Sequence, residues 1–152
     1  MDWRALLFSP NGRINRAKYW LTVLIYLVVW LLFVVVAAVL MGGIRAAVVN
    51  ASSGAGLILG VVGFVLIVGA FWSGIAVAIK RLHDRDKSGW WLLLFWLGPS
   101  VLNGIGATIG SAGQILFGLA SVVITLWAFV ELGCLQGTEG PNQYGPDPLS
   151  AS

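Results

Sequence analysis

A histidine stands directly beside an aspartate in the segment Lys80–Gly89, and this pair offers the clearest acid–base chemistry in the chain. His83 and Asp84 could act together as a general acid and a general base on a substrate held at this segment. The competing interpretation is a histidine that hydrogen-bonds a neighbour and only shapes the loop. No nucleophile motif accompanies the pair, so we assign no catalytic residue.

Metal binding is a second chemistry that this segment could support, because Asp86 adds a third ligand to His83 and Asp84. Four Lys and Arg side chains within the same ten residues oppose a bound cation. Cys134 is the only cysteine, which excludes an internal disulfide and a site built on several cysteines. We therefore expect no metal and no cofactor.

Two polar residues stand within or near long apolar runs. A carboxylate at membrane depth is costly, so Glu131 either pairs with a cation or moves a proton or substrate. We favour a structural ion pair with a basic residue of the N-terminal segment or of the Lys80–Gly89 loop. Asn103, near Pro99, is the best polar candidate within the membrane for a transport path.

The composition indicates that most of this chain is surrounded by lipid. Apolar residues make up 59% and charged residues 10%, whereas soluble domains average about 25% charged. The Lys and Arg residues do not form the basic stripe of a nucleic-acid-binding surface, so we expect no nucleic-acid partner.

The uncharged runs predict an all-α, polytopic membrane helical bundle, because each run is long enough for a spanning helix of about 20 residues. We treat residues 1–152 as a single membrane domain, with an interfacial N-terminal segment (1–18), a four-helix region (19–135) and a turn-rich tail (136–152). A small polar loop is expected at residues 50–54. The predicted transmembrane helices are Tyr19–Met41, Leu57–Ile79, Trp90–Ile109 and Gln114–Leu135.

The third helix leaves an alternative open. From Gly89 to Val130 there are 42 uncharged residues, which favours two crossings with a break near Gly110. Gly98-Pro99 interrupts the first of these, and proline removes a backbone donor. If residues 89–110 were re-entrant instead, three crossings would remain and the C-terminus would change sides.

The basic residues carry topology information. Eight of the nine Lys and Arg fall in the N-terminal segment and the Lys80–Lys87 loop, and Arg45 stands alone. With four crossings these two segments and the tail share one side. The positive-inside rule makes that side cytoplasmic, so both termini are expected there.

Three stretches together resemble one known family: Phe8–Trp20, Lys80–Trp91 and Gly137–Pro148. In order and spacing they are similar to the domain-of-unknown-function 805 family of small bacterial inner-membrane proteins. The family pattern often has an acidic residue at the position of Lys18 and a small or apolar residue at that of Asp86. The resemblance implies a bacterial inner-membrane location and carries no known activity.

Four crossings would bring the three stretches together at the cytoplasmic interface. We expect Ser88 to cap the third helix, and the tail to fold back on the loop with Asp147 near a basic residue. The predicted cytoplasmic-face cluster comprises Gly12, Arg13, Arg16, Arg81, His83, Asp84, Ser88, Gly89, Trp90, Asn142, Tyr144, Gly145 and Asp147.

The favoured function is a binding or assembly protein rather than an enzyme. Its cluster would engage anionic lipid, a protein partner or a second copy of the chain, because basic residues near an anionic surface are attracted to it. The alternatives are a small transporter or channel component and an enzyme acting on a lipid headgroup. The cations proposed to bind anionic lipid are Arg13, Arg16, Lys18, Arg81, Arg85 and Lys87.

Overall fold

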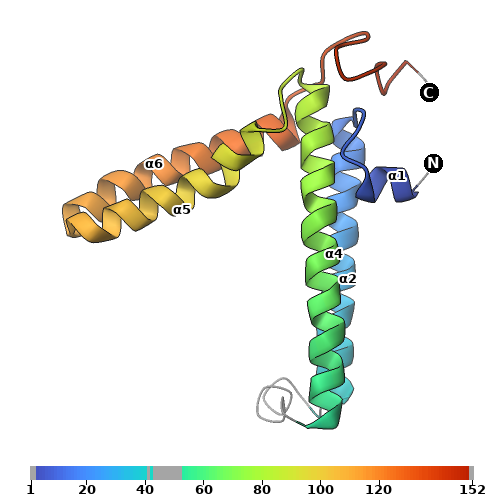
Figure 1. Cartoon of the computed structure of the whole chain (residues 1–152), viewed down its shortest axis with the longest axis vertical. Helices are drawn as coiled ribbons and strands as arrows, with labels where there is room; N and C mark the ends of the chain where they lie inside the picture. Colours follow the sequence, from blue (N-terminus) through green and yellow to red (C-terminus); the bar gives the residue numbers. More distant parts are fainter. Residues whose placement is uncertain (1–2, 41, 43–52, 151–152) are drawn as a thin grey trace.

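The computed structural model describes residues 3–40, 42 and 53–150, and these residues form helices, connections and an irregular tail (Figure 1). No β-strand occurs in the described part of the chain, which confirms the all-α prediction. Four helices are long and apolar enough to cross a membrane. The elements are α1 (Trp3–Phe8), α2 (Arg16–Leu40), α4 (Gly54–Asp84), α5 (Trp91–Ile109), α6 (Ser111–Phe129) and the π-helix η1 (Val130–Cys134).

The first two long helices extend beyond their predicted bounds at the charged end. α2 begins at Arg16 because the Asn15 side-chain oxygen accepts from the Lys18 N–H at 2.9 Å and caps the helix. The 31 residues of α4 are about 46 Å long, so its charged end projects beyond a hydrocarbon layer of about 30 Å. Met41, Arg45 and most of the predicted 50–54 loop lie outside the described residues.

α5 passes through Gly98-Pro99 without a break, as a crossing helix would. Its 19 residues are about 28 Å long, close to the hydrocarbon thickness. The Ser121 hydroxyl of α6 donates to the Pro99 carbonyl at 3.1 Å and so ties the two helices together at this point. Gly110, at a positive φ of 97°, alone separates α5 from α6 at the predicted break.

The four long helices pair as two hairpins. In Figure 1, α2 and α4 lie side by side, and the α5–α6 hairpin leaves them at a wide angle. The hairpins meet at one polar end, which we call the head; it comprises residues 9–15, the last turn of α4, the 85–90 connection, η1 and the tail from residue 135. Of the largest buried apolar cluster, Leu82 and Leu132 belong to the head.

Away from the head the helices present apolar side chains to their surroundings. Leu27, Val39 and Leu116 are 65%, 75% and 66% exposed. Such surfaces are compatible with lipid rather than with water, so the membrane-spanning character lies in the helices and the polar chemistry lies in the head.

A close approach between α5 and α6 generates a stability prediction. A Cβ on Gly106 would lie 3.0 Å from the Gly113 carbonyl oxygen and 3.2 Å from the Gln114 Cα, whereas one on Gly104 would meet nothing within 4 Å. We expect Gly106→Ala to cost about 1–3 kcal/mol through overpacking. Gly104→Ala should be neutral or raise stability by up to about 1 kcal/mol. Thermal unfolding in detergent measures both, and equal melting temperatures would contradict the close approach.

Candidate functional site

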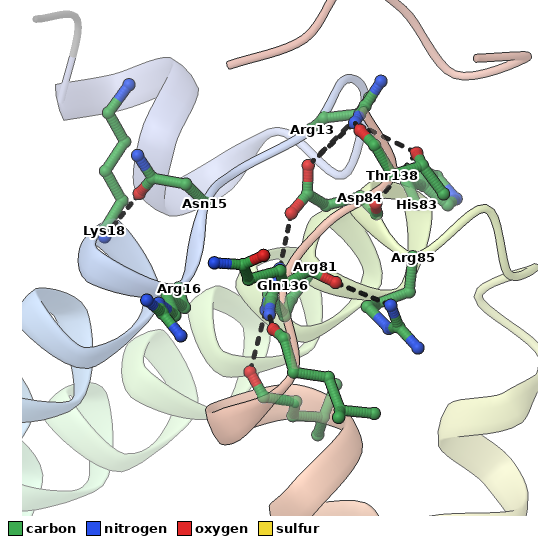
Figure 2. A network of polar contacts seen from close by, with 12 residues as sticks. Arg13, Asn15, Arg16, Lys18, Arg81, His83, Asp84, Arg85, Gln136 and Thr138 are labelled. Carbon is green, nitrogen blue, oxygen red and sulfur yellow. Dashed lines mark hydrogen bonds and ion pairs between the residues drawn. The ribbon is translucent and has the colours of Figure 1, made fainter. Parts of the chain in front are cut away.

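A buried charge network lies at the centre of the head (Figure 2). Arg81 and Asp84 occupy the last turn of α4, where Arg81 Nη1 is 2.5 Å from Asp84 Oδ2. Arg13, from the N-terminal segment, places its Nη2 3.1 Å from Asp84 Oδ1. The three side chains are between 0% and 3% exposed, so one carboxylate balances two guanidinium groups away from water.

The remaining guanidinium donors of Arg13 and Arg81 bind backbone carbonyls. Arg13 donates to the Thr138 and Gly140 carbonyls at 2.6 and 2.7 Å, so it holds the tail. Arg81 Nε donates to the Leu132 carbonyl at 2.8 Å and its Nη2 to the Leu135 carbonyl. These charges are therefore satisfied inside the protein, as buried charges require.

The π-helix η1 and the residue that follows it, Leu135, supply the carbonyls that Arg81 binds. π-helical turns are rare and often occur at functional sites. The Trp20 indole N–H donates to the Gly133 carbonyl at 2.9 Å, and a Cβ on Gly133 would lie 2.8 Å from this indole ring. Because the last carbonyls of a helix lack partners within it, Arg81 and Trp20 act as its side-chain caps. The sequence contains no signal that predicts this turn.

Glu131 lies in η1 and forms the predicted ion pair. Its carboxylate oxygens are 3.0 Å from Arg85 Nε and 3.0 Å from Lys87 Nζ. The Glu131 side chain is 4% exposed, while those of Arg85 and Lys87 are 25% and 28% exposed. Lys87 Nζ also lies 5.3 and 5.8 Å from the ring centroids of Trp91 and Trp127. Again two cations share one carboxylate, but here both reach the surface.

The short helix α1 is fixed to the side of α4. Its last carbonyls, those of Ala5–Phe8, all accept hydrogen bonds from α4 side chains. Lys80 Nζ donates to the Ala5 carbonyl at 2.7 Å and also to that of Leu6. The Ser73 hydroxyl donates to the Leu7 carbonyl at 2.5 Å, and the Trp72 indole N–H to that of Phe8 at 3.3 Å. Lys80 and Ser73 were not among the predicted site residues.

The tail folds back on the Lys80–Gly89 segment, as predicted, but the first five residues of this segment continue α4 rather than form a loop. Asn142 Nδ2 donates to the His83 carbonyl at 2.9 Å, and the Thr138 N–H donates to the Asp84 carbonyl at 2.8 Å. The Tyr144 ring stacks on the His83 imidazole, with centroids 3.8 Å apart and planes 3° apart. His83 Nδ1 lies 3.3 Å from the Gly12 carbonyl oxygen. This arrangement favours the loop-shaping interpretation of His83 over acid–base chemistry.

Asp147 organises a turn within the tail. Its carboxylate accepts from the Leu149 N–H at 2.9 Å and from the Gly140 N–H at 3.1 Å. The hydrogen bond from Leu149, followed by that from Gly140 and the charge of Arg13, lowers the pKa of Asp147. Gly145, at a positive φ of 135°, bridges to Asn142 and offers its carbonyl to Arg13 at 3.3 Å. Arg13 is thus the basic residue whose charge acts on Asp147, although the two side chains do not form a direct ion pair.

The other predicted residues have varied surroundings. The Ser88 hydroxyl accepts from the Trp90 N–H at 3.4 Å, so it caps the turn before α5 rather than the helix itself. Arg16 is exposed and donates to the Cys134 carbonyl at 3.4 Å. Asn103 is exposed on α5 and does not join the head. Among residues 3–40, 42 and 53–150, no group of three or more potential metal ligands occurs.

A polar cavity of about 360 Å³ opens between the start of α2 and the tail, beside Asp84. Arg16 lines it together with the carboxylates of Glu139 and Asp147. Three carboxylates and one guanidinium line this cavity, so it lacks the positive excess that an anionic ligand would need.

Comparisons with known proteins found one matching family model and several relatives. Residues 7–146 match the family described as "Protein of unknown function (DUF805)". The chain is 31% identical to "Uncharacterized protein YiiR" of Escherichia coli K12 over 93% of its own length and 86% of the relative. It is 29% identical to "Inner membrane protein YhaI" (93% and 87%) and to "Inner membrane protein YhaH" (97% and 97%) of the same organism. No solved structure matches the chain.

The central carboxylate gives a prediction with a neighbouring control. Asp84→Asn removes the one negative charge that Arg13 and Arg81 share, so we expect a loss of about 3–5 kcal/mol of stability. Asp86→Asn should stay within about 0.5 kcal/mol, because Asp86 is exposed and asparagine tolerates its φ of 56°. Denaturant unfolding in detergent compares the two variants. An Asp84→Asn protein as stable as Asp86→Asn would refute the buried network.

Proposed function

The chain belongs to the DUF805 family and is a multi-pass inner-membrane protein, and we propose that it binds anionic lipid headgroups at the cytoplasmic face of that membrane. The partner class is a phospholipid with a net negative charge. In this proposal the head lies on the cytoplasmic side of the membrane.

Charge supports this orientation. Eight of the nine Lys and Arg belong to the N-terminal segment and the Lys80–Lys87 stretch, which lie at the head or beside it, at the same end of the α2–α4 pair. An excess of basic residues favours the cytoplasmic side. α1 and the tail lie at this same end of the α2–α4 pair (Figure 1), so both terminal segments would be cytoplasmic.

The observation that carries the proposal is the cluster of Arg85, Glu131 and Lys87. Its two cations share one buried carboxylate, so one positive charge is left uncompensated at the surface. Trp91 and Trp127 flank Lys87, and tryptophan is enriched at the level of the lipid headgroups. A phosphate group offers oxygen acceptors to the guanidinium and ammonium donors at this level.

The other basic residues of this region are less suited to bind a lipid headgroup than Arg85 and Lys87. Arg13 and Arg81 have side chains that are 1% and 0% exposed and already bind Asp84 and carbonyls, so they contribute to the fold rather than to a ligand. Arg16 and Lys18 reach the surface but lack a flanking carboxylate–tryptophan arrangement like that of Lys87.

The alternative functions have less support. Asn103, the candidate for a transport path, lines neither the polar cavity of the head nor the crevice between α4 and α5. His83, the candidate acid–base group of a headgroup enzyme, is covered by Tyr144 on one ring face and bonded to Gly12. A binding role therefore fits the head better than catalysis or transport.

The orientation predicts the behaviour of C-terminal reporter fusions in bacterial cells. A fluorescent protein that matures only in the cytoplasm should fluoresce when fused after Ser152, because four crossings return the tail to the side of the N-terminus. Alkaline phosphatase at the same position should be inactive. A fusion with active phosphatase and no fluorescence would overturn the cytoplasmic tail.

The headgroup site predicts a selective loss of anionic lipid. Lys87→Gln removes the uncompensated charge but leaves Glu131 paired with Arg85, so the fold should persist. At about 1 kcal/mol per basic residue, phosphatidylglycerol retained after purification from mixed vesicles should fall about fivefold by native mass spectrometry. Retention of phosphatidylcholine should not change.

Lys18→Gln is the matched control, since it makes the same chemical change at the same end of the protein. We expect a clearly smaller loss of phosphatidylglycerol from this variant. Equal losses from both variants would mean that only the total charge of the head matters, and this would refute a site at Glu131.

A further inference from the structure

We propose that the crevice between α4 and α5 binds a single acyl chain of a phospholipid from the leaflet in which the head lies. This site is distinct from the headgroup cluster and rests on independent observations. The crevice has a volume of about 550 Å³, within the range of small-molecule sites. Its lining includes Phe71, Ile79 and His83 of α4, Ser88 of the connection, and Leu93 and Trp96 of α5.

The crevice has apolar walls and one polar end. Phe71, Leu93 and Leu97 line it and are 59%, 50% and 57% exposed, so their faces lack a protein partner. Polar side chains enter the lining only at the head, where His83 and Ser88 lie. An occupant must therefore be apolar along its length and polar at the end nearest the head, as an esterified acyl chain is.

The length of the crevice matches one leaflet. The α4 wall runs from Phe71 to His83, about 18 Å at 1.5 Å per residue. Half of a hydrocarbon core of about 30 Å is close to this length. The rings of Phe71 and Trp96, with centroids 5.4 Å apart, bring α4 and α5 together at the end remote from the head. A chain entering beside the head would thus end near the middle of the bilayer.

The polar end can hold the ester that joins an acyl chain to its headgroup. The Ser88 oxygen accepts from the Trp90 N–H, which leaves the hydroxyl hydrogen to donate to an ester carbonyl. Gly89 permits the connection to pass close to α4, because a Cβ there would lie 3.1 Å from Ile79. Tyr144 covers His83 from the tail side, so the headgroup would leave the crevice sideways, at the membrane interface.

A filling substitution tests this site by native mass spectrometry. The protein is reconstituted in vesicles of phosphatidylcholine alone and purified in mild detergent. Leu93→Trp fills the crevice and should reduce the retained phospholipid at least tenfold. Leu116→Trp makes the same change at an exposed position of α6 that does not line this crevice, and this variant should retain phospholipid as the unmodified protein does. Equal retention by Leu93→Trp and Leu116→Trp would overturn the proposal.

A photo-crosslinking amino acid at position 93 gives a second measurement that does not depend on a filled crevice. After washing in detergent, position 93 should yield at least tenfold more phospholipid adduct than position 116, and a crosslink to another polypeptide instead would refute the acyl chain. Phosphatidylcholine carries no net charge, so its retention in the crevice does not require the uncompensated charge at Lys87. Lys87→Gln should retain this lipid, so the two proposals can fail separately.

Discussion

The head depends on the Arg81 guanidinium, which is buried in the last turn of α4 and must satisfy all its donors without water. Asp84 supplies one partner, and the carbonyls of Leu132 and Leu135 supply others. Because Asp84 also binds Arg13, and Arg13 binds the tail carbonyls, the same network joins three segments that are distant in sequence: the N-terminal segment, the end of α4, and η1 with the tail. A buried charge without partners costs several kcal/mol, so each segment is held to its place by the others.

Backbone carbonyls explain how one carboxylate can balance two guanidinium groups. The C-terminus of a helix carries partial negative charge on its unpaired carbonyls. Arg81 occupies that end of η1, and Arg13 binds the Thr138 and Gly140 carbonyls of the tail. These carbonyls share the compensation of the buried charge with Asp84. The buried network of the head therefore holds the two hairpins together. Arg85 and Lys87 differ from it: they carry two positive charges against the single carboxylate of Glu131, and both remain partly exposed to a ligand.

The sequence predicted what depends on local hydrophobicity and charge. Uncharged runs located the four long helices, and the cost of a carboxylate in an apolar run predicted the partners of Glu131. The π-helical turn was not predictable, because the side chains that bind its carbonyls, Arg81 and Trp20, are remote from it in sequence. The interaction of Lys80 with α1 was missed for a similar reason: the positive-inside rule reads a lysine as a topology signal and is silent on its hydrogen-bond partners.

The wide angle between the two hairpins could not be predicted from the sequence either. The reason is that lipid, rather than protein, surrounds the facing sides of α4 and α5. Within the bilayer, apolar side chains of α4 and α5 gain no hydrophobic free energy by leaving lipid to contact each other, so no hydrophobic force draws the hairpins together. Their angle is set where they meet, at the head and through a few contacts such as Phe71 with Trp96. An acyl chain in the crevice would bind the open arrangement and not a closed one, and such differential affinity favours the open state. A bound acyl chain and the contacts of the head would then both help to set the angle between the hairpins.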